Sequence, residues 1–339
     1  MTDVYFCTNR NASPQNNPKR FGSEFSKSGM ADLRFGVAKV NGKKVSVQTH
    51  GESLKQAKGK NETDDSKSKF GSKVLLNDLR AKMKNEKSDT IVFIHGYNVS
   101  FKEAMQSAAQ VAENFDKLNS GRTVNIITFS WPSDGSMMPW IAYSNDRSDA
   151  AASGAAVARA ILKLRDFLYG LSKAEACDQK IHLIAHSMGN FVLRNALQEI
   201  RSQSASGIPR IFDQIFLMAA DEDDNAFEHD FKLKLLPRLG RRVNVYFNRG
   251  DRAMSISDRT KGNPDRLGDD GPRAPFQVPA KVTQVDCTPV VGGIVEHSYY
   301  VDEPKVVEDM AQVMAGFDPM AVSGRKFLAD RNRFVILGD

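Results

Sequence analysis

This 339-residue sequence has few cysteines, no long apolar run and no repeat of the length found in solenoid proteins. Cys7, Cys177 and Cys287 are odd in number and lack the CxxC or Cys/His spacing of metal sites, which argues against a disulfide framework and against structural zinc. No stretch approaches the roughly 20 apolar residues that a membrane helix needs, and the first residues lack the apolar core of a secretory signal. We therefore expect a cytoplasmic protein that starts at Met1, has no membrane span and lies in a reducing compartment.

Charge is unevenly distributed along the chain. Residues 1–90 hold 18 Lys and Arg against 10 Asp and Glu, whereas the remainder holds 29 against 31, so the net charge of +6 comes from the first segment. Such a segment fits either an anionic partner or a solvated, lysine-rich loop. The lysines have few aromatic residues among them and form no nucleic-acid-binding motif, so we expect the solvated loop and no nucleic-acid partner.

From residue 89 onward, short apolar runs alternate with stretches of helical spacing. Residues 90–94 form a β-branched and aromatic run of the kind that is buried on both faces of a parallel sheet. Ser100 followed by Glu103 is typical of a helix start. The other predicted strands are 124–129, 181–185, 214–218, 243–247 and 282–285, and the other predicted helices are 148–169, 189–200, 227–236 and 304–314. This alternation predicts an α/β fold, with a mostly parallel sheet covered by helices on both faces.

The segment before residue 89 has a different pattern. It contains short predicted strands, a polar stretch that indicates a long loop, and a helix; these are strands 3–7, 33–40 and 44–48, loop 50–69 and helix 73–84. We expect an N-terminal extension over 1–88 that packs on a catalytic core over 89–316. A short C-terminal tail over 317–339 follows.

A strand that runs directly into a helix carries the sharpest chemical signal. In the sequence IHLIAHSMGN, Ser187 lies between the small residues Ala185 and Gly189, at the junction of the strand and the helix. This is the pattern of a nucleophile elbow, where the turn is so tight that larger side chains would collide with neighbouring backbone. We therefore predict that Ser187 is a nucleophile in a strained backbone conformation, with the amide of Met188 directed at the same space. The alternative is an ordinary buried serine.

A second amide donor for an oxyanion hole is expected in the loop after the strand at 90–94. That strand is followed by His95, Gly96, Tyr97 and Asn98. Gly96 lets the backbone turn, so the amide of Tyr97 is the predicted donor, and Asn98 is a further candidate through its amide or side chain. We expect His95 to brace the loop by hydrogen bonds rather than to transfer protons.

The general base is reached by elimination among the six histidines. In this type of site the partners follow the nucleophile in the order Ser, acid, His. His229 lies within a predicted helix, where a solvated face explains it, and the remaining candidate after Ser187 is His297, in a loop before the last helix. We predict that His297 is the base.

Acidic residues follow two different strands, so the acid is less constrained. Asp221, Asp223 and Asp224 follow the strand at 214–218, whereas Asp251 follows the strand at 243–247 in a short glycine turn. We rank Asp251 ahead of Asp221 as the acid that fixes the imidazole tautomer, and Asp223 or Asp224 is expected to cap a helix.

Six short segments in order along residues 4–315 resemble the α/β-hydrolase superfamily. They resemble in particular a bacterial family of such hydrolases that is catalogued as of unknown function. The segments are VYFCTNR at residue 4, FIHGYN at residue 93, FSWPS at residue 129, IAHSMG at residue 184, YFNRGDRAM at residue 246 and HSYY at residue 297. Transferred residue by residue, the resemblance implies Ser187, Asp251 and His297 as a catalytic triad, in agreement with the reading above. The resemblance does not indicate which substrate is cleaved.

Both tryptophans lie just after the strand at 124–129, where loops line the site in open α/β sheets. An apolar acyl pocket is therefore predicted from this segment and the loop residue Asn98; its members are Asn98, Trp131, Met137, Met138, Trp140 and Tyr143. The alternative is simple packing over the core, which we favour for Trp131.

These residues together predict a serine hydrolase that cleaves small-molecule carboxylic esters through an acyl-enzyme, with no cofactor and no metal. One alternative is a lipase or phospholipase that acts at a membrane surface, with the basic N-terminal segment holding anionic lipid. A second alternative is a binding protein that kept the fold without catalysis.

Overall fold

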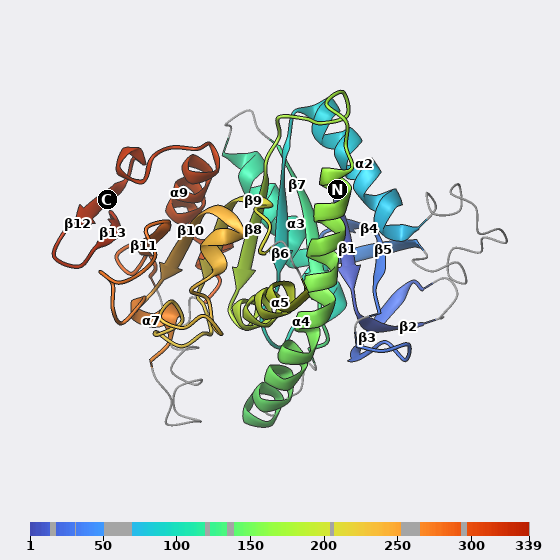
Figure 1. Cartoon of the computed structure of the whole chain (residues 1–339), viewed down its shortest axis with the longest axis horizontal. Coiled ribbons are helices and arrows are strands. Elements are labelled where there is room, and N and C mark those ends of the chain that lie inside the picture. Colours follow the sequence, from blue (N-terminus) through green and yellow to red (C-terminus); the bar gives the residue numbers. More distant parts are fainter. Residues whose placement is uncertain are drawn as a thin grey trace. The chain divides into compact units, whose positions relative to one another are not determined.

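Contacts within the chain divide the computed structural model into two units, Met1–Lys180 and Ile181–Asp339, which are described in turn (Figure 1). This division differs from the predicted boundaries at residues 88 and 316, which stay a prediction. The structure describes residues 1–13, 18–30, 32–50, 70–118, 123–133, 139–203, 207–251, 265–292 and 297–338, without the side chains of 139–142.

The first unit is built on strands in the order β6-β7-β1-β4-β5. Strands β6, β7 and β1 are parallel, and β4 and β5 add to them as an antiparallel pair. The bounds are β1 Thr2–Thr8, β4 Arg34–Asn41, β5 Lys44–His50, β6 Asp89–Ile94 and β7 Val124–Ser130. A separate hairpin, not predicted from the sequence, consists of β2 (Arg10–Ser13) and β3 (Arg20–Phe25). The predicted loop over 50–69 lies almost wholly outside the described residues.

The described residues of the first unit form three helices, with the bounds α2 Gly71–Glu86, α3 Phe101–Lys117 and α4 Pro139–Tyr169. The predicted capping box at the start of α3 is confirmed, because Ser100 accepts a hydrogen bond from the Glu103 amide and the Glu103 carboxylate accepts one from the Ser100 amide. Helix α4 begins before the predicted start at Ser148. Its first residue is Pro139, which is tolerated there because the first amide of a helix needs no intrahelical partner.

The second unit is built on strands in the order β12-β13-β11-β10-β9-β8. All neighbouring pairs from β8 to β13 are parallel, and β12 pairs antiparallel with β13. The bounds are β8 Ile181–His186, β9 Phe212–Met218, β10 Gly240–Phe247, β11 Val282–Asp286, β12 Arg325–Leu328 and β13 Arg333–Ile336. Every residue of β8 and β11 is buried, which explains why apolar and β-branched residues predominate in these strands.

The helices of the second unit have the bounds α5 Gly189–Gln203, α7 Leu267–Asp270, α8 Tyr299–Asp302 and α9 Pro304–Met314, with single 3-10 turns at Leu236–Arg238 and Pro319–Ala321. The predicted helix over 227–236 is wrong, because these residues form a series of turns. Lys232 is buried, and its ammonium group donates a hydrogen bond to Asp223 at 2.6 Å and another to Asn225. The amide of Leu233 reaches back to the carbonyl of Ala226 at 2.8 Å. Phe227, Leu233 and Leu236 are thus buried without an α-helix, while Phe231 is exposed.

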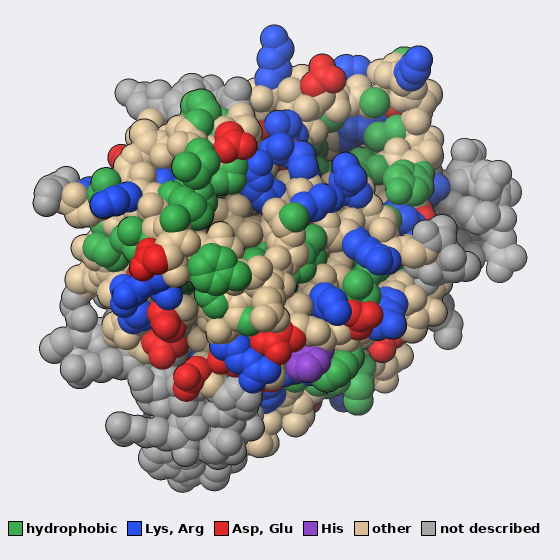
Figure 2. All heavy atoms as spheres, turned by 60° about the vertical axis from the view of Figure 1, so that its left-hand side comes forward, with side chains coloured by type: hydrophobic (Ala, Val, Ile, Leu, Met, Phe, Trp, Pro, Cys, Tyr) green, Lys and Arg blue, Asp and Glu red, His purple; other side chains and the backbone are tan. Residues whose placement is uncertain are grey.

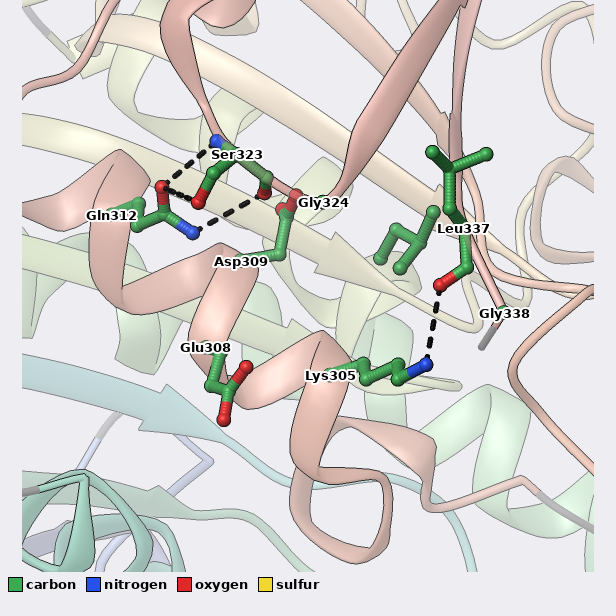
Figure 3. A pocket seen from close by; sticks show the side chains of 9 residues that line it. Lys305, Glu308, Asp309, Gln312, Ser323, Gly324, Leu337 and Gly338 are labelled. Atoms are coloured by element: carbon green, nitrogen blue, oxygen red, sulfur yellow. Dashed lines mark hydrogen bonds between the residues drawn. The ribbon is translucent and has the colours of Figure 1, made fainter.

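Residues after 317 form a hairpin, β12 and β13, that extends the second unit's sheet. Arg325 is fixed by two hydrogen bonds of 2.7 Å to the buried carboxylate of Asp309 on α9. A cavity of about 290 Å³ lies between α9 and the hairpin (Figure 3), and Lys305, Glu308, Asp309, Gln312, Ser323, Gly324, Ile336, Leu337 and Gly338 line it. Gln312 hydrogen-bonds Ser323 across this space, so the cavity marks the junction of the hairpin with α9.

The surface carries charges of both signs. Figure 2 shows Lys and Arg side chains interspersed with apolar and acidic side chains on the face in view. Within the described ranges, no helix has both the length and the apolar character needed to cross a bilayer.

Candidate active site

The turn between β8 and α5 presents Ser187. Its φ of +52° is rare for a residue with a side chain, so the predicted strained conformation is confirmed. The backbone on both sides is held by the adjacent strand, because the Ser187 amide donates to the Met218 carbonyl at 3.0 Å and the Ser187 carbonyl accepts from the Asp221 amide at 3.2 Å. Asn190 donates to the carbonyls of Ala185 and Ser187, each at 3.0 Å. The turn is therefore braced by backbone groups and by one side chain of its own helix.

Asp251 and His297 meet in the second unit. The Nδ1 of His297 lies 2.7 Å from Oδ2 of Asp251, whose side chain is fully buried, while 21% of the His297 side chain is exposed. The carboxylate thus fixes the imidazole with Nδ1 toward the acid, which leaves Nε2 as the nitrogen for proton transfer. Asp221, the competing acid, instead lies 3.4 Å from the buried guanidinium of Arg266. The geometry favours Asp251.

His186, the residue before Ser187, contacts the segment that carries His297. Its Nε2 lies 3.0 Å from the main-chain oxygen of His297, and its ring centroid lies 4.7 Å from that of His297 and 4.5 Å from that of Tyr300. The order Ser, acid, His does not point to His186, because His186 precedes Ser187 in the chain. Its contacts depend on strand order, which the local sequence does not give.

Met188 immediately precedes α5. Its amide therefore belongs to the N–H groups at a helix start that have no intrahelical acceptor, and the helix dipole adds partial positive charge there. Its side chain is fully buried. This position suits the predicted role of the Met188 amide as an oxyanion donor.

In the first unit, the loop after β6 is braced by His95, as predicted. His95 is buried, with Nδ1 2.7 Å from the Gly96 oxygen and Nε2 accepting from the Trp131 amide at 3.2 Å. Its ring stacks on that of Trp131 with centroids 5.2 Å apart, and the indole N–H donates to the His95 carbonyl. Burial, with the nearby Arg10 charge, lowers the pKa of His95 to about 3, so the ring is neutral near pH 7.

The next residues of this loop are held by polar groups from distant segments. The Asn98 amide, at a φ of +58°, donates to Asp146 on α4 at 3.0 Å, and the same carboxylate oxygen accepts from the Ser133 hydroxyl at 2.5 Å. The buried guanidinium of Arg10 donates to the Val99 carbonyl at 2.6 Å. Because the Asn98 amide is engaged by Asp146, the structure argues against it as an oxyanion donor, and Tyr97 stays the predicted one.

Of the residues predicted for the acyl pocket, the structure describes the side chains of Asn98, Trp131 and Tyr143. The rings of Tyr97 and Tyr143 meet edge to face with centroids 5.9 Å apart. Trp131 is fully buried and packs in the loop, as favoured from the sequence. Met137 and Met138, and the side chain of Trp140, lie outside the described residues, so their part in a pocket stays a prediction.

In the described part of the chain, no three His, Cys, Asp or Glu side chains gather closely enough to hold a metal ion. The candidate site consists of Ser187, Asp251 and His297 with the adjacent backbone, and His297 and Asp251 are joined by a hydrogen bond.

Comparison with known proteins identifies the family of the chain. Residues 72–315 match the model of a family described as "Alpha/beta hydrolase of unknown function (DUF900)". A relative from Nostoc sp., the uncharacterized protein alr1448, is 29% identical over 134 residues, which cover 34% of this chain and 32% of that protein. The match thus spans about a third of the relative's length. Since the family model covers more than half of the sequence, the chain belongs to this family of α/β hydrolases, and the predicted fold and family are confirmed.

Proposed function

We propose that this α/β hydrolase is a serine hydrolase that cleaves carboxylic esters through an acyl-enzyme. The observation that carries the proposal is the 2.7 Å contact of His297 with buried Asp251 in the same unit as Ser187, which sits in a left-handed turn before a helix. A buried carboxylate, an oriented imidazole and a strained serine are the parts that activate a neutral hydroxyl as a nucleophile.

In the proposed reaction, Nε2 of His297 takes the Ser187 proton as Oγ attacks the acyl carbon. The oxyanion that forms accepts a hydrogen bond from the Met188 amide and, as predicted from the sequence, from the Tyr97 amide. Collapse of this intermediate breaks the bond to the alcohol, which leaves with the proton held by His297. A water molecule, deprotonated by the same imidazole, then attacks the acyl-enzyme and releases the acid and free Ser187. Asp251 stabilises the imidazolium at each step without taking the proton.

The proposal favours esters of medium, uncharged acyl chains. The half-buried ring of Tyr97 packs against buried Tyr143 and offers aromatic surface beside its own amide, the predicted second donor. The neighbouring segment is rich in methionine and tryptophan. The same catalytic residues would also cleave thioesters, lactones or amides. We therefore expect the predicted acyl pocket to select substrates by their acyl group rather than by their leaving group.

Hydrolysis of p-nitrophenyl esters with acyl chains of two to twelve carbons tests the proposal. We expect the wild-type protein to show its highest kcat/KM at intermediate length, and Ser187→Ala to lower kcat by at least about 10³-fold, because the nucleophile is gone. The far-ultraviolet circular dichroism of both proteins serves as the folding control. Equal rates for the wild type and Ser187→Ala would overturn the proposal.

A further inference from the structure

Tyr299 starts helix α8, two residues after His297. Its ring is fully buried. Its hydroxyl accepts a hydrogen bond from the Ala219 amide at 2.8 Å and donates one to the Tyr246 carbonyl, also at 2.8 Å. Burial raises the pKa of this phenol well above its usual range, so the hydroxyl stays protonated and keeps its donor.

The two backbone groups that bind this hydroxyl belong to the strands next to the other two candidate triad residues. Ala219 directly follows Met218, whose carbonyl holds the Ser187 amide. Tyr246 lies near the end of β10, and the chain passes from there through a short turn, in which the Asp251 amide donates to the Asn248 carbonyl at 3.1 Å. One hydroxyl therefore connects the segment that carries His297 with the backbone that holds Ser187 and with the strand that leads to Asp251.

The hydroxyl occupies the point where β9 and β10 separate. Met218 and Tyr246 form the last paired residues of these strands, and Ala219 then turns away with a φ of +43°. The Ala219 amide also approaches the Tyr246 carbonyl directly, at 3.3 Å. Without the hydroxyl, the Ala219 amide and the Tyr246 carbonyl would still have this longer contact with each other. A phenylalanine at 299 is therefore compatible with folding.

We propose that Tyr299 is a positioning residue for His297, holding the start of α8, and with it the imidazole, against the strands that support Ser187 and Asp251. The inference rests on the proposed function, since it assigns a role in the proton transfer that the function requires. Small displacements of a base cost much of its rate, because proton transfer needs hydrogen-bond distance and alignment.

Tyr299→Phe tests this inference, with Tyr5→Phe as the matched control. Tyr5 is a buried tyrosine of the first unit whose hydroxyl donates to Asp78 at 2.7 Å, so the same atom is removed from a comparable bond. For Tyr299→Phe we expect kcat on the best p-nitrophenyl ester to fall about 10- to 100-fold with KM little changed, since the chemical step depends on the base. Tyr5→Phe should keep both constants.

Proton NMR of protein with ¹⁵N-labelled histidine supplies a readout that does not depend on turnover. The downfield proton between His297 Nδ1 and Asp251, assigned by its loss in His297→Ala, should shift or broaden in Tyr299→Phe and stay in place in Tyr5→Phe. An unchanged proton signal together with wild-type kcat in Tyr299→Phe would overturn the inference while leaving the esterase proposal intact. A wild-type protein without Ser187-dependent ester hydrolysis would instead overturn the esterase proposal, and the proton signal alone would then decide whether Tyr299 positions His297.

Discussion

Two loops that follow buried parallel strands are held in different ways. The turn after β8 is fixed by backbone groups of Met218, the last residue of the neighbouring strand β9, and of Asp221 shortly after it, which bind the Ser187 amide and carbonyl. The loop after β6 is fixed by side chains from distant parts of its unit, namely Arg10, Trp131, Ser133 and Asp146. Both loops contain a non-glycine residue in the left-handed region, Ser187 in one and Asn98 in the other.

This difference determines which substitutions each loop tolerates. A turn held by backbone hydrogen bonds depends on small neighbours and strand pairing, whereas a loop held by buried side chains depends on each of those groups being present and satisfied. We therefore expect substitutions near the first loop to act on chemistry, and substitutions near the second to act on chemistry and stability together.

The largest effect is expected from Asp251→Asn. Asparagine keeps the volume of the side chain but does not stabilise the imidazolium or enforce the productive tautomer, so kcat should fall by about 10³- to 10⁴-fold while the free energy of unfolding changes little. Steady-state kinetics and urea unfolding measure the two quantities.

Asp221→Asn provides the comparison, because Asp221 lies beside Arg266 rather than His297. We expect it to reduce stability by about 1–3 kcal/mol, since a buried arginine loses part of its charge compensation. If Asp221→Asn lowered kcat as far as Asp251→Asn does, the assignment of the acid would be wrong.

A smaller effect on rate is expected from Asp146→Asn, in the loop held by side chains. The carboxylate accepts from the Asn98 amide and the Ser133 hydroxyl, and charge strengthens both bonds. Its loss should lower kcat by about 10-fold through a less ordered Tyr97 amide and reduce stability by about 1–3 kcal/mol. Ser148→Ala, on an exposed position of the same helix, is the control. A loss of stability of this size without any change in kcat would show that this loop takes no part in the chemistry.

The last prediction concerns stability alone, with no effect on kcat. It is the pH dependence that His95 adds to the free energy of unfolding. His95 takes up a proton near pH 6.5 when unfolded but only near pH 3 when folded, because burial disfavours its charged form. The unfolded state therefore binds more protons between these values. The free energy of unfolding should fall as pH decreases through this window, by up to about 1.4 kcal/mol per pH unit from this group.

Chemical denaturation of the wild type and of His95→Gln from pH 7 to pH 4 measures this contribution. The variant is expected to be less stable at pH 7, because it loses contacts with Trp131, and to show a flatter pH dependence. Parallel curves for the two proteins would show that His95 is not held neutral in the folded state.

The comparison of the two loops also explains what the sequence could predict. The elbow was predictable because its requirements are local: Ala185 and Gly189 flank Ser187 between an apolar strand and a helix. The contact between Asp251 and His297 was expected because His297 follows Ser187 in the chain and Asp251 lies in a short glycine turn after a strand. The contacts of Asp146 with Asn98, and of Tyr299 with Ala219, join residues far apart in sequence, and no local sequence pattern predicts them.

Two other features show the same limit. The segment 227–236 has apolar residues at helical spacing, but its fold is decided by the buried Lys232 and its partners, which override helix propensity. The hairpin of β12 and β13 depends on pairing between β13 and β11 and on the Arg325–Asp309 contact. Each strand of that hairpin has four residues, too short to stand out from a tail.

The central claim, that Ser187 is an activated nucleophile, is tested most directly by a fluorophosphonate probe followed by peptide mass spectrometry. The wild-type protein should acquire one adduct on the peptide that contains Ser187. Asp251→Asn should react much more slowly and Ser187→Ala not at all. Folded wild-type protein that acquires no adduct, or an adduct that persists in Ser187→Ala, would contradict the claim.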